Sequence, residues 1–347
     1  MCCGGCIKDA YETFNAIANR STRSKSRQEI HRPVIHFVVT SHGAINSGSI
    51  APKPTTTWAA GGKQRNPRQH TTVVMSVENP VSQLDEAERN EIEQRKPPRA
   101  AVLHETVGRT GEEELRRSAS SLAWSGLAAG LSMGFSMVAG GALRAHLPES
   151  PVGALVSSIG YSTGFVIVIL ARQQLFTENT LTAVLPLMSA PSLAKAGALL
   201  RLWCIVLIGN LIGVIAFAYG VARLPLFDAE MLRAFDAMGR ELMAYSTPQM
   251  FFKAILGGWI IAMMVWLMAA VDAARLWIIV GLTWLIALAG LVHVIGSAAE
   301  VFYLVFDGHA GWGEALGHFL GPVLAGNIVG GSLIFALISH AQVRGEI

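Results

Sequence analysis

The chain has 347 residues, of which 52% are hydrophobic and only 15% are charged. Soluble domains carry about 25% charged residues, so this composition indicates a membrane protein. The net charge of +3 is small and unevenly placed, which argues against nucleic-acid binding. Three cysteines crowd the N-terminus and Cys204 lies in an apolar stretch, so we expect no disulfide framework, no metal site and no cofactor.

The first third of the chain is polar. Residues 1–74 show no sustained period that could bury a core, and we expect a disordered tail or an over-extended start. Met75 opens a more acidic, helix-prone stretch, so residues 75–117 are expected to form a polar cytoplasmic segment. Residues 118–344 are then the transmembrane domain.

Six apolar segments follow, and each supplies about 20 apolar residues or two shorter halves. They lie at about 120–143, 156–188, 197–222, 251–271, 276–306 and 319–339. The second is interrupted by the polar run ARQQLFTENT and the fifth around 290–296. Six spans place both termini on one side of the membrane. A slight Lys/Arg bias favours the cytoplasmic side.

A short motif recurs in the third and sixth segments. The pattern Gly-Asn-x-x-Gly occurs at 209–213 and again at 326–330, an offset of 117 residues. The same offset carries His293, in the fifth segment's break, onto Phe176, in the second segment's break. Three spans per half force the halves into opposite orientations. The sequence therefore predicts an all-α, inverted 3+3 repeat whose site lies near the midplane between the halves.

His293 is the first candidate for a functional residue. It lies in a helix break about midway through a segment long enough to span a bilayer, where freed backbone groups must face protein or a cavity. An ionisable residue at that depth indicates a functional site. A histidine that only packs against a neighbouring helix is the alternative. We expect Asn210 and Asn327 to hydrogen-bond the backbone groups that the breaks set free.

Several of these motifs together resemble the formate/nitrite transporter family. They are QLFTENTLTAVLP at 174–186, GNLIG, MVWLMAA in the fourth span, His293 and AGNIVGG, and the resemblance covers about 115–344. ARQQLFTEN and ISHAQVR look closest to a divergent bacterial branch of this family. The resemblance implies an aquaporin-like homopentamer in the bacterial inner membrane, with one pore per subunit and a lipid-filled centre. It also implies passage of small monovalent anions such as formate or nitrite, often with a proton.

The resemblance also implies roles for individual residues. His293 looks like the central pore histidine, with Asn327 as its polar neighbour. The apolar and loop residues that would line the constrictions are Leu175, Phe176, Thr177, Phe165 and Ile261. The chain departs from the family pattern at Val292, where a Glu is common, and at Gln174, Gly258 and Ser297. The family's vestibule lysine has no clear counterpart, although Lys253 is a candidate that we interpret first as an interface lysine.

A bare anion in a low-dielectric constriction is costly, on the order of tens of kcal/mol in the idealised limit. Helix N-termini in the breaks and a titrating histidine would lower that cost. Arg172 could attract anions, or it could pair with Glu178 or Glu300 and hold the loop. Besides an anion channel or proton-coupled transporter, two other functions remain open. One is a pore for neutral solutes (ammonia, hydrogen sulfide or an undissociated acid), and the other is a non-conducting structural or regulatory membrane protein. No catalytic constellation indicates an enzyme.

Overall fold

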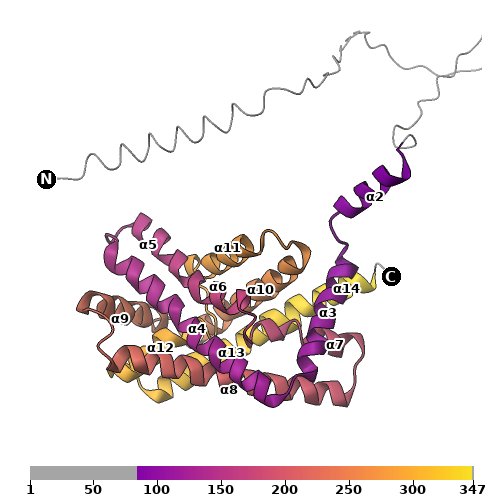
Figure 1. Ribbon diagram of the computed structural model, residues 1–347. Helices are drawn as coiled ribbons and strands as arrows, with labels where there is room; N and C mark the ends of the chain where they lie inside the picture. The colour runs from indigo at the N-terminus through magenta and orange to yellow at the C-terminus, as the bar shows by residue number, and fades with distance from the viewer. Residues whose placement is uncertain (1–83, 346–347) are drawn as a thin grey trace, which may run out of the picture. The chain divides into compact units, whose positions relative to one another are not determined.

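The computed structural model describes residues 84–345, which form helices and turns and contain no β-strand (Figure 1). The stretch 1–74, expected to be a tail or an over-extended start, lies outside the described residues. The α-helices are α2 (Glu86–Arg95), α3 (Ala100–Arg116), α4 (Ala119–His146), α5 (Pro151–Ser157), α6 (Ser162–Leu170), α7 (Val184–Ser189), α8 (Leu193–Arg223), α9 (Ala229–Met243), α10 (Thr247–Ala270), α11 (Arg275–Leu288), α12 (Ala298–Asp307), α13 (Gly321–Ile328) and α14 (Leu337–Arg344). Shorter 3₁₀ turns are η2 (Ser158–Tyr161) and η3 (Glu178–Thr180), and π-helical stretches are η4 (Glu314–Leu320) and η5 (Val329–Ala336).

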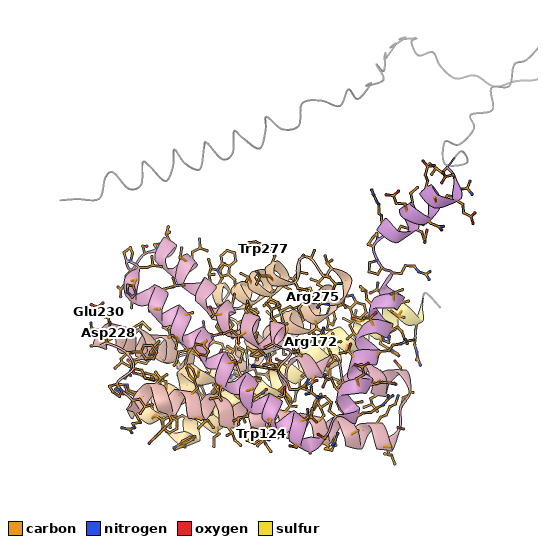
Figure 2. All side chains as sticks on the ribbon, viewed as in Figure 1. Trp124, Arg172, Asp228, Glu230, Arg275 and Trp277 are labelled. Atoms are coloured by element: carbon orange, nitrogen blue, oxygen red, sulfur yellow. The ribbon has the colours of Figure 1, made fainter. Side chains whose placement is uncertain are left out.

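Five helical segments among the described residues are long and apolar enough to cross a membrane. They are Ala119–His146, Pro151–Leu170, Leu193–Arg223, Thr247–Ala270 and Trp312–Arg344. The predicted fifth span instead consists of two shorter helices, α11 and α12, separated by a non-helical stretch. Large apolar side chains remain on the outside of the bundle, including Trp124, which is 70% exposed, and Trp277, which is 75% exposed (Figure 2). Such a surface matches a lipid environment rather than water.

Serine residues set the starts of the long helices. The Ser118 side chain accepts a hydrogen bond from the Ser121 N–H at the start of α4, and Ser192 accepts one from the Lys195 N–H at the start of α8. Ser246 and Gln249 form a reciprocal capping box at the start of α10. The first N–H groups of a helix have no intrahelical acceptor, so these caps determine where each apolar helix begins.

Small residues let pairs of long helices approach closely. A Cβ atom at Gly130 in α4 would lie 2.1 Å from the backbone oxygen of Asn210 in α8. A Cβ atom at Gly330 in η5 would lie 1.9 Å from the backbone oxygen of Ile255 in α10. Both contacts place a Gly-Asn-x-x-Gly motif against a partner helix, as small residues do in membrane helix pairs.

The two interruptions begin in the same way. Arg172, two residues after the end of α6, has φ of 52°, and Gly290, two residues after the end of α11, has φ of 60°, both in the left-handed region. In each case the next N–H bonds back five residues, from Gln173 to Val168 O and from Leu291 to Ile286 O, both at 2.9 Å. This is the Schellman ending of a helix, and Gly accommodates it without the strain that Arg172 carries.

Helix α3 is amphipathic and packs against α7, α10 and α14 at one end of the bundle. Its buried side includes Leu103, Val107 and His104. The Nε2 atom of His104 lies 3.0 Å from Nδ1 of His340 in α14. Burial, and then the neighbouring His340, lowers the pKa of His104 below its ordinary value of 6.5.

This pKa shift predicts that acid loosens α3. The docked helix binds fewer protons than the detached one, so its docking is fully stable above about pH 6.5 and weakens as the pH falls below that value. Amide hydrogen exchange should show the protection of α3 falling as the pH is lowered below about 6.5. The His104→Gln variant, which cannot titrate there, should lose most of this dependence. An unchanged pH dependence in that variant would contradict the assignment.

Candidate functional site

The first interruption is held by Asn210 of α8. Its side-chain oxygen accepts a hydrogen bond from the Phe176 N–H at 2.9 Å. Its amide nitrogen donates to the backbone oxygens of Gln174 and Gly126, each at 2.8 Å. Asn210 is fully buried, so one side chain both satisfies the interrupted backbone and ties it to α4.

Asn327 of α13 does the same for the second interruption. Its side-chain oxygen accepts from the Val294 N–H at 2.8 Å. Its amide nitrogen donates to Val292 O at 3.2 Å and to Ala254 O of α10 at 2.7 Å. The hydrogen bonds expected of both asparagines are therefore confirmed.

These bonds also correct the predicted register of the two loops. The asparagines are 117 residues apart, but their loop partners, Phe176 with Val294 and Gln174 with Val292, are 118 apart. His293 therefore corresponds to Leu175 rather than to Phe176. The offset changes by one because the chain between loop and motif is one residue shorter in the second half.

The two interruptions meet at His293 and Thr177. The His293 Nε2 atom lies 2.6 Å from the Thr177 Oγ1 atom, and both residues are fully buried. The Gly296 N–H donates to His293 Nδ1 at 2.8 Å. A backbone N–H can only donate, so Nδ1 carries no proton, and the neutral ring donates through Nε2–H to Thr177. The Thr177 hydroxyl hydrogen remains available to a further acceptor.

An aromatic ring from α6, that of Phe165, packs against the His293–Thr177 pair. The ring of Phe165 meets the His293 ring edge-on, with centroids 5.0 Å apart. Ile261 of α10 and Leu175 are fully buried as well. The Phe176 ring instead packs against Trp203 of α8, with centroids 5.7 Å apart, and the Trp203 indole donates to Asn179 O at 3.1 Å. Phe165, rather than Phe176, is the aromatic ring in contact with the histidine.

The charged candidates do not form the ion pairs that were considered from the sequence. Arg172 is exposed, and within residues 84–345 no ion pair joins it to Glu178 or Glu300. Glu178 lies in η3 and is partly buried. Glu300 is 7% exposed in the first turn of α12. The two carboxylates therefore sit apart from Arg172, which the strained turn at the end of α6 directs outward.

Lys253 has a different position from the one its sequence suggests. The Lys253 Nζ atom donates to the backbone oxygen of Gly290 at 2.9 Å and lies 4.4 Å from the centroid of the Tyr245 ring. The amine therefore points into the second interruption and satisfies the carbonyl of its left-handed residue. The bent backbone thus supplies Lys253 with an acceptor that periodicity cannot reveal, and the interpretation of Lys253 as an interface lysine stays a prediction.

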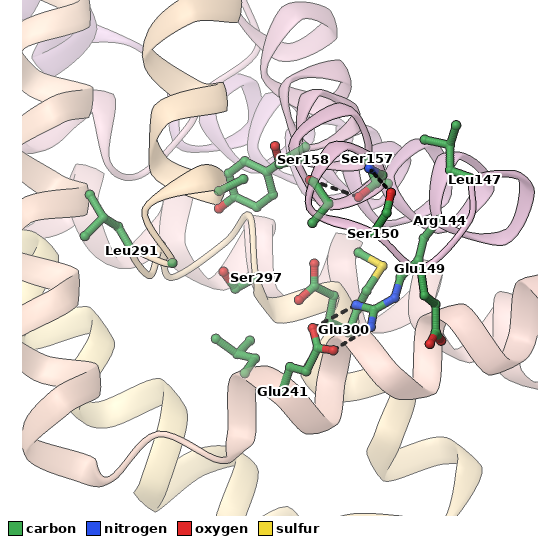
Figure 3. A pocket seen from close by; sticks show the side chains of 18 of the residues that line it. Arg144, Leu147, Glu149, Ser150, Ser157, Ser158, Glu241, Leu291, Ser297 and Glu300 are labelled. Atoms are coloured by element: carbon green, nitrogen blue, oxygen red, sulfur yellow. Dashed lines mark hydrogen bonds and ion pairs between the residues drawn. The ribbon is translucent and has the colours of Figure 1, made fainter.

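A cavity of about 660 Å³ opens at the end of α4 remote from α3, and Leu291 and Ser297, on either side of His293 in the chain, contribute to its lining (Figure 3). We call it the vestibule cavity. Its lining includes Arg144 of α4, Glu241 of α9, and Tyr161, Ser297 and Glu300 near the interruption. Sequence reasoning missed Tyr161, although it lies one helical turn before Phe165 and therefore on the same face. The ring centroids of these two residues are 5.4 Å apart.

Comparison with known proteins identifies the family. Residues 101–341 match the family profile described as "Formate/nitrite transporter". The chain belongs to the formate/nitrite transporter family. Among curated members, it is similar to "Inner membrane protein YfdC" of Escherichia coli (strain K12), with 46% identity over 255 residues, covering 74% of this chain and 82% of the relative.

More distant formate/nitrite transporter relatives include the "Probable formate transporter" of Methanothermobacter thermautotrophicus, 26% identical over 223 residues, or 58% of this chain and 79% of the relative. Two solved structures share the fold. One is described as "FNT family ion channel", with a TM-score of 0.59, 21% identity and coverage of 69% of this chain and 98% of that chain. The other is described as "Pentameric formate channel with formate bound", with a TM-score of 0.54, 17% identity and coverage of 65% and 97%.

The asparagine bonds make a direct prediction about assembly. Asn327→Leu removes the partners of the Val294 N–H and of two buried carbonyl oxygens, and each unsatisfied group costs about 1–3 kcal/mol. We expect lower thermal stability in detergent, poorer assembly and reduced flux. Asn210→Leu should behave alike. Leu333→Ala, on the exposed side of η5, is the control and should remain near wild type. An Asn327→Leu protein that assembles and transports normally would contradict the role.

Proposed function

We propose that this protein is a channel or proton-coupled transporter for small monovalent anions of weak acids, such as formate or nitrite, across the cytoplasmic membrane. The observation that carries the proposal is the buried His293–Thr177 pair, in which side chains from the two interruptions meet. Family membership supports it, as do the relative described as a probable formate transporter and the solved formate channel of the same fold.

The proposed architecture has six spans in two inverted halves, with the second and fifth spans broken. Five long apolar segments, the split α11 and α12, and the matching asparagine bonds support it. We also propose a homopentamer in the bacterial inner membrane with both termini in the cytoplasm. The description of one solved relative as pentameric, and of another relative as an inner membrane protein, supports the assembly and the location.

The proposed mechanism starts from the hydrogen bonds of the pair. With Nδ1 accepting from Gly296 and Nε2–H donating to Thr177, the pair presents the Thr177 hydroxyl hydrogen to a passing anion. This hydrogen bond compensates part of the anion's lost hydration. Delivering a proton requires a second proton on the ring, and placing it on Nδ1 breaks the Gly296 bond. Proton coupling is therefore a step with a defined structural change, at one backbone N–H.

Apolar side chains complete the constriction. Phe165 against the histidine, with Leu175 and Ile261 buried nearby in the chain's core, would dewet the passage and admit only a neutralised or compensated species. The residue before the histidine is Val292, so no carboxylate adjoins the ring. The Lys253 amine, which could attract an anion, is engaged by Gly290 O.

Those last two observations favour a second candidate function, a pore for neutral small solutes such as ammonia, hydrogen sulfide or an undissociated acid. A neutral histidine with no adjoining carboxylate suits a solute that needs no proton. Uptake by proteoliposomes from a panel of formate, nitrite, hydrosulfide and ammonium separates the two. Uptake of formate or nitrite that generates current supports the first candidate, and uptake of ammonia or hydrogen sulfide without any formate or nitrite current supports the second.

Replacing the histidine tests the anion proposal directly. His293→Phe preserves aromatic bulk and should leave assembly intact while abolishing or reshaping weak-acid uptake. His293→Asn keeps hydrogen-bonding capacity but cannot titrate, so uptake should lose its pH dependence before it loses conduction. Val292→Glu should increase proton-coupled uptake. If the His293→Asn protein keeps the wild-type pH dependence in liposomes, the histidine serves only packing.

Two phenylalanines offer a matched test of selectivity. Phe165→Ala should widen the passage at the histidine and admit larger monocarboxylates, because the removed ring contacts His293. Phe176→Ala removes an equally buried ring that packs on Trp203. It should lower stability by a similar amount, about 3–5 kcal/mol, with less effect on substrate ranking. Relative uptake of formate, acetate and lactate measures the difference. Equal relaxation in both variants would place both rings at the constriction.

A further inference from the structure

The charges around the vestibule cavity are mainly negative. Its ionisable lining residues, apart from tyrosines, are Arg144, Glu149, Glu241 and Glu300. The single arginine, Arg144, is already paired, because its two terminal nitrogens donate hydrogen bonds of 2.7 and 2.5 Å to the two carboxylate oxygens of Glu241 (Figure 3). The fork geometry of this pair uses both carboxylate oxygens. The other two carboxylates, Glu149 and Glu300, form no ion pair within residues 84–345, and Arg144 acts on both only through longer-range attraction.

Glu300 at the floor is the distinctive member. Its side chain is 7% exposed and lines the cavity, yet it makes no hydrogen bond or ion pair with any residue of the described chain. It occupies the first turn of α12, where the helix dipole favours negative charge. A buried carboxylate is costly in its ionised form unless it is paired, so a ligand that brings positive charge and hydrogen-bond donors would hold Glu300 in that form.

The neighbouring groups indicate the kind of ligand. The Ser297 and Tyr161 hydroxyls line the cavity alongside Glu300 and can accept hydrogen bonds. A divalent metal ion needs several oxygen or nitrogen ligands at once. Within the described residues, the group that could hold a metal is Asp236, Asp307 and His309, which does not include Glu300. One carboxylate with hydroxyls instead matches a small cation that carries its own N–H donors.

We propose that the vestibule cavity binds a small monovalent cation of the ammonium class, with the Glu300 carboxylate as its main acceptor. The site does not depend on the proposed anion transport, and it would exist even if the pore conducts only neutral solutes. Its position beside Ser297 places the cation four residues from His293, at the entrance to the constriction. A neutral-solute pore would thereby gain a local supply of the protonated form of its substrate.

The test uses the full-length protein in detergent and ¹⁴C-methylammonium, which stays protonated at neutral pH, in a scintillation proximity assay. Wild type should show saturable binding that ammonium chloride displaces. Equal concentrations of potassium chloride or tetramethylammonium chloride should not displace it, because neither cation carries N–H donors. In Glu300→Gln the affinity should fall at least about tenfold, because the amide oxygen can still accept a hydrogen bond but the negative charge that strengthens it is lost. Glu300→Asp, which keeps the charge, should retain weaker binding and serves if the glutamine variant misfolds.

Glu149→Gln is the matched control. It neutralises an exposed carboxylate at the same cavity and should change the affinity no more than about twofold, since exposed charges are screened. The absence of saturable binding in wild type would overturn the proposal. So would equal binding in wild type and Glu300→Gln, or displacement by potassium as effective as by ammonium. Failure of formate uptake in liposomes leaves this binding measurement unaffected, so the two proposals fail separately.

Discussion

Backbone groups inside a membrane need partners from the protein, and this requirement governs the centre of the molecule. Each interruption exposes N–H and C=O groups that a continuous helix would have paired. A single buried asparagine supplies the missing donors and acceptor in each case, and also anchors the loop to a third helix. Because an unpaired group in hydrocarbon costs several kcal/mol, the interruptions can exist only where these amides reach them. The glycines beside each asparagine bring the helix backbones close enough for that reach.

The functional chemistry follows from this support. Holding both loops rigidly brings Thr177 of one against His293 of the other, although 116 positions separate them. The Gly296 N–H then selects the ring tautomer, so the protonation state of the histidine is linked to the backbone geometry of its own loop. With the His293 ring held by these two hydrogen bonds, the site presents the Thr177 hydroxyl hydrogen to a passing solute and not the positive charge of a protonated imidazole. That arrangement is compatible with passage of a neutralised acid and with passage of a neutral solute.

Charge is distributed unevenly between the cavity and the constriction. The positive side chains near the site are occupied, Arg144 by Glu241 and Lys253 by a backbone oxygen. The carboxylate of Glu300 forms no ion pair within residues 84–345, although Arg144 attracts it at longer range. The excess of carboxylates lining this cavity repels an anion and attracts a cation, and it has little effect on a neutral molecule. The vestibule cavity of this chain therefore has more negative than positive side chains in its lining, which does not favour the entry of anions.

The sequence alone determined the helical class, the apolar segments, both interruptions, the two asparagines and the histidine. These features depend on local composition and spacing, since a polar run or a Gly-rich stretch interrupts an apolar helix wherever it occurs. The tertiary structure decided which side chains meet. Thr177 is the hydrogen-bond partner of His293, Phe165 rather than Phe176 packs against it, and the loops match with an offset of 118 rather than 117. The contacts of Arg144 with Glu241 and of Lys253 with Gly290 likewise join distant segments. They depend on how the helices pack and, for Gly290, on how the interrupted backbone bends, and periodicity encodes neither.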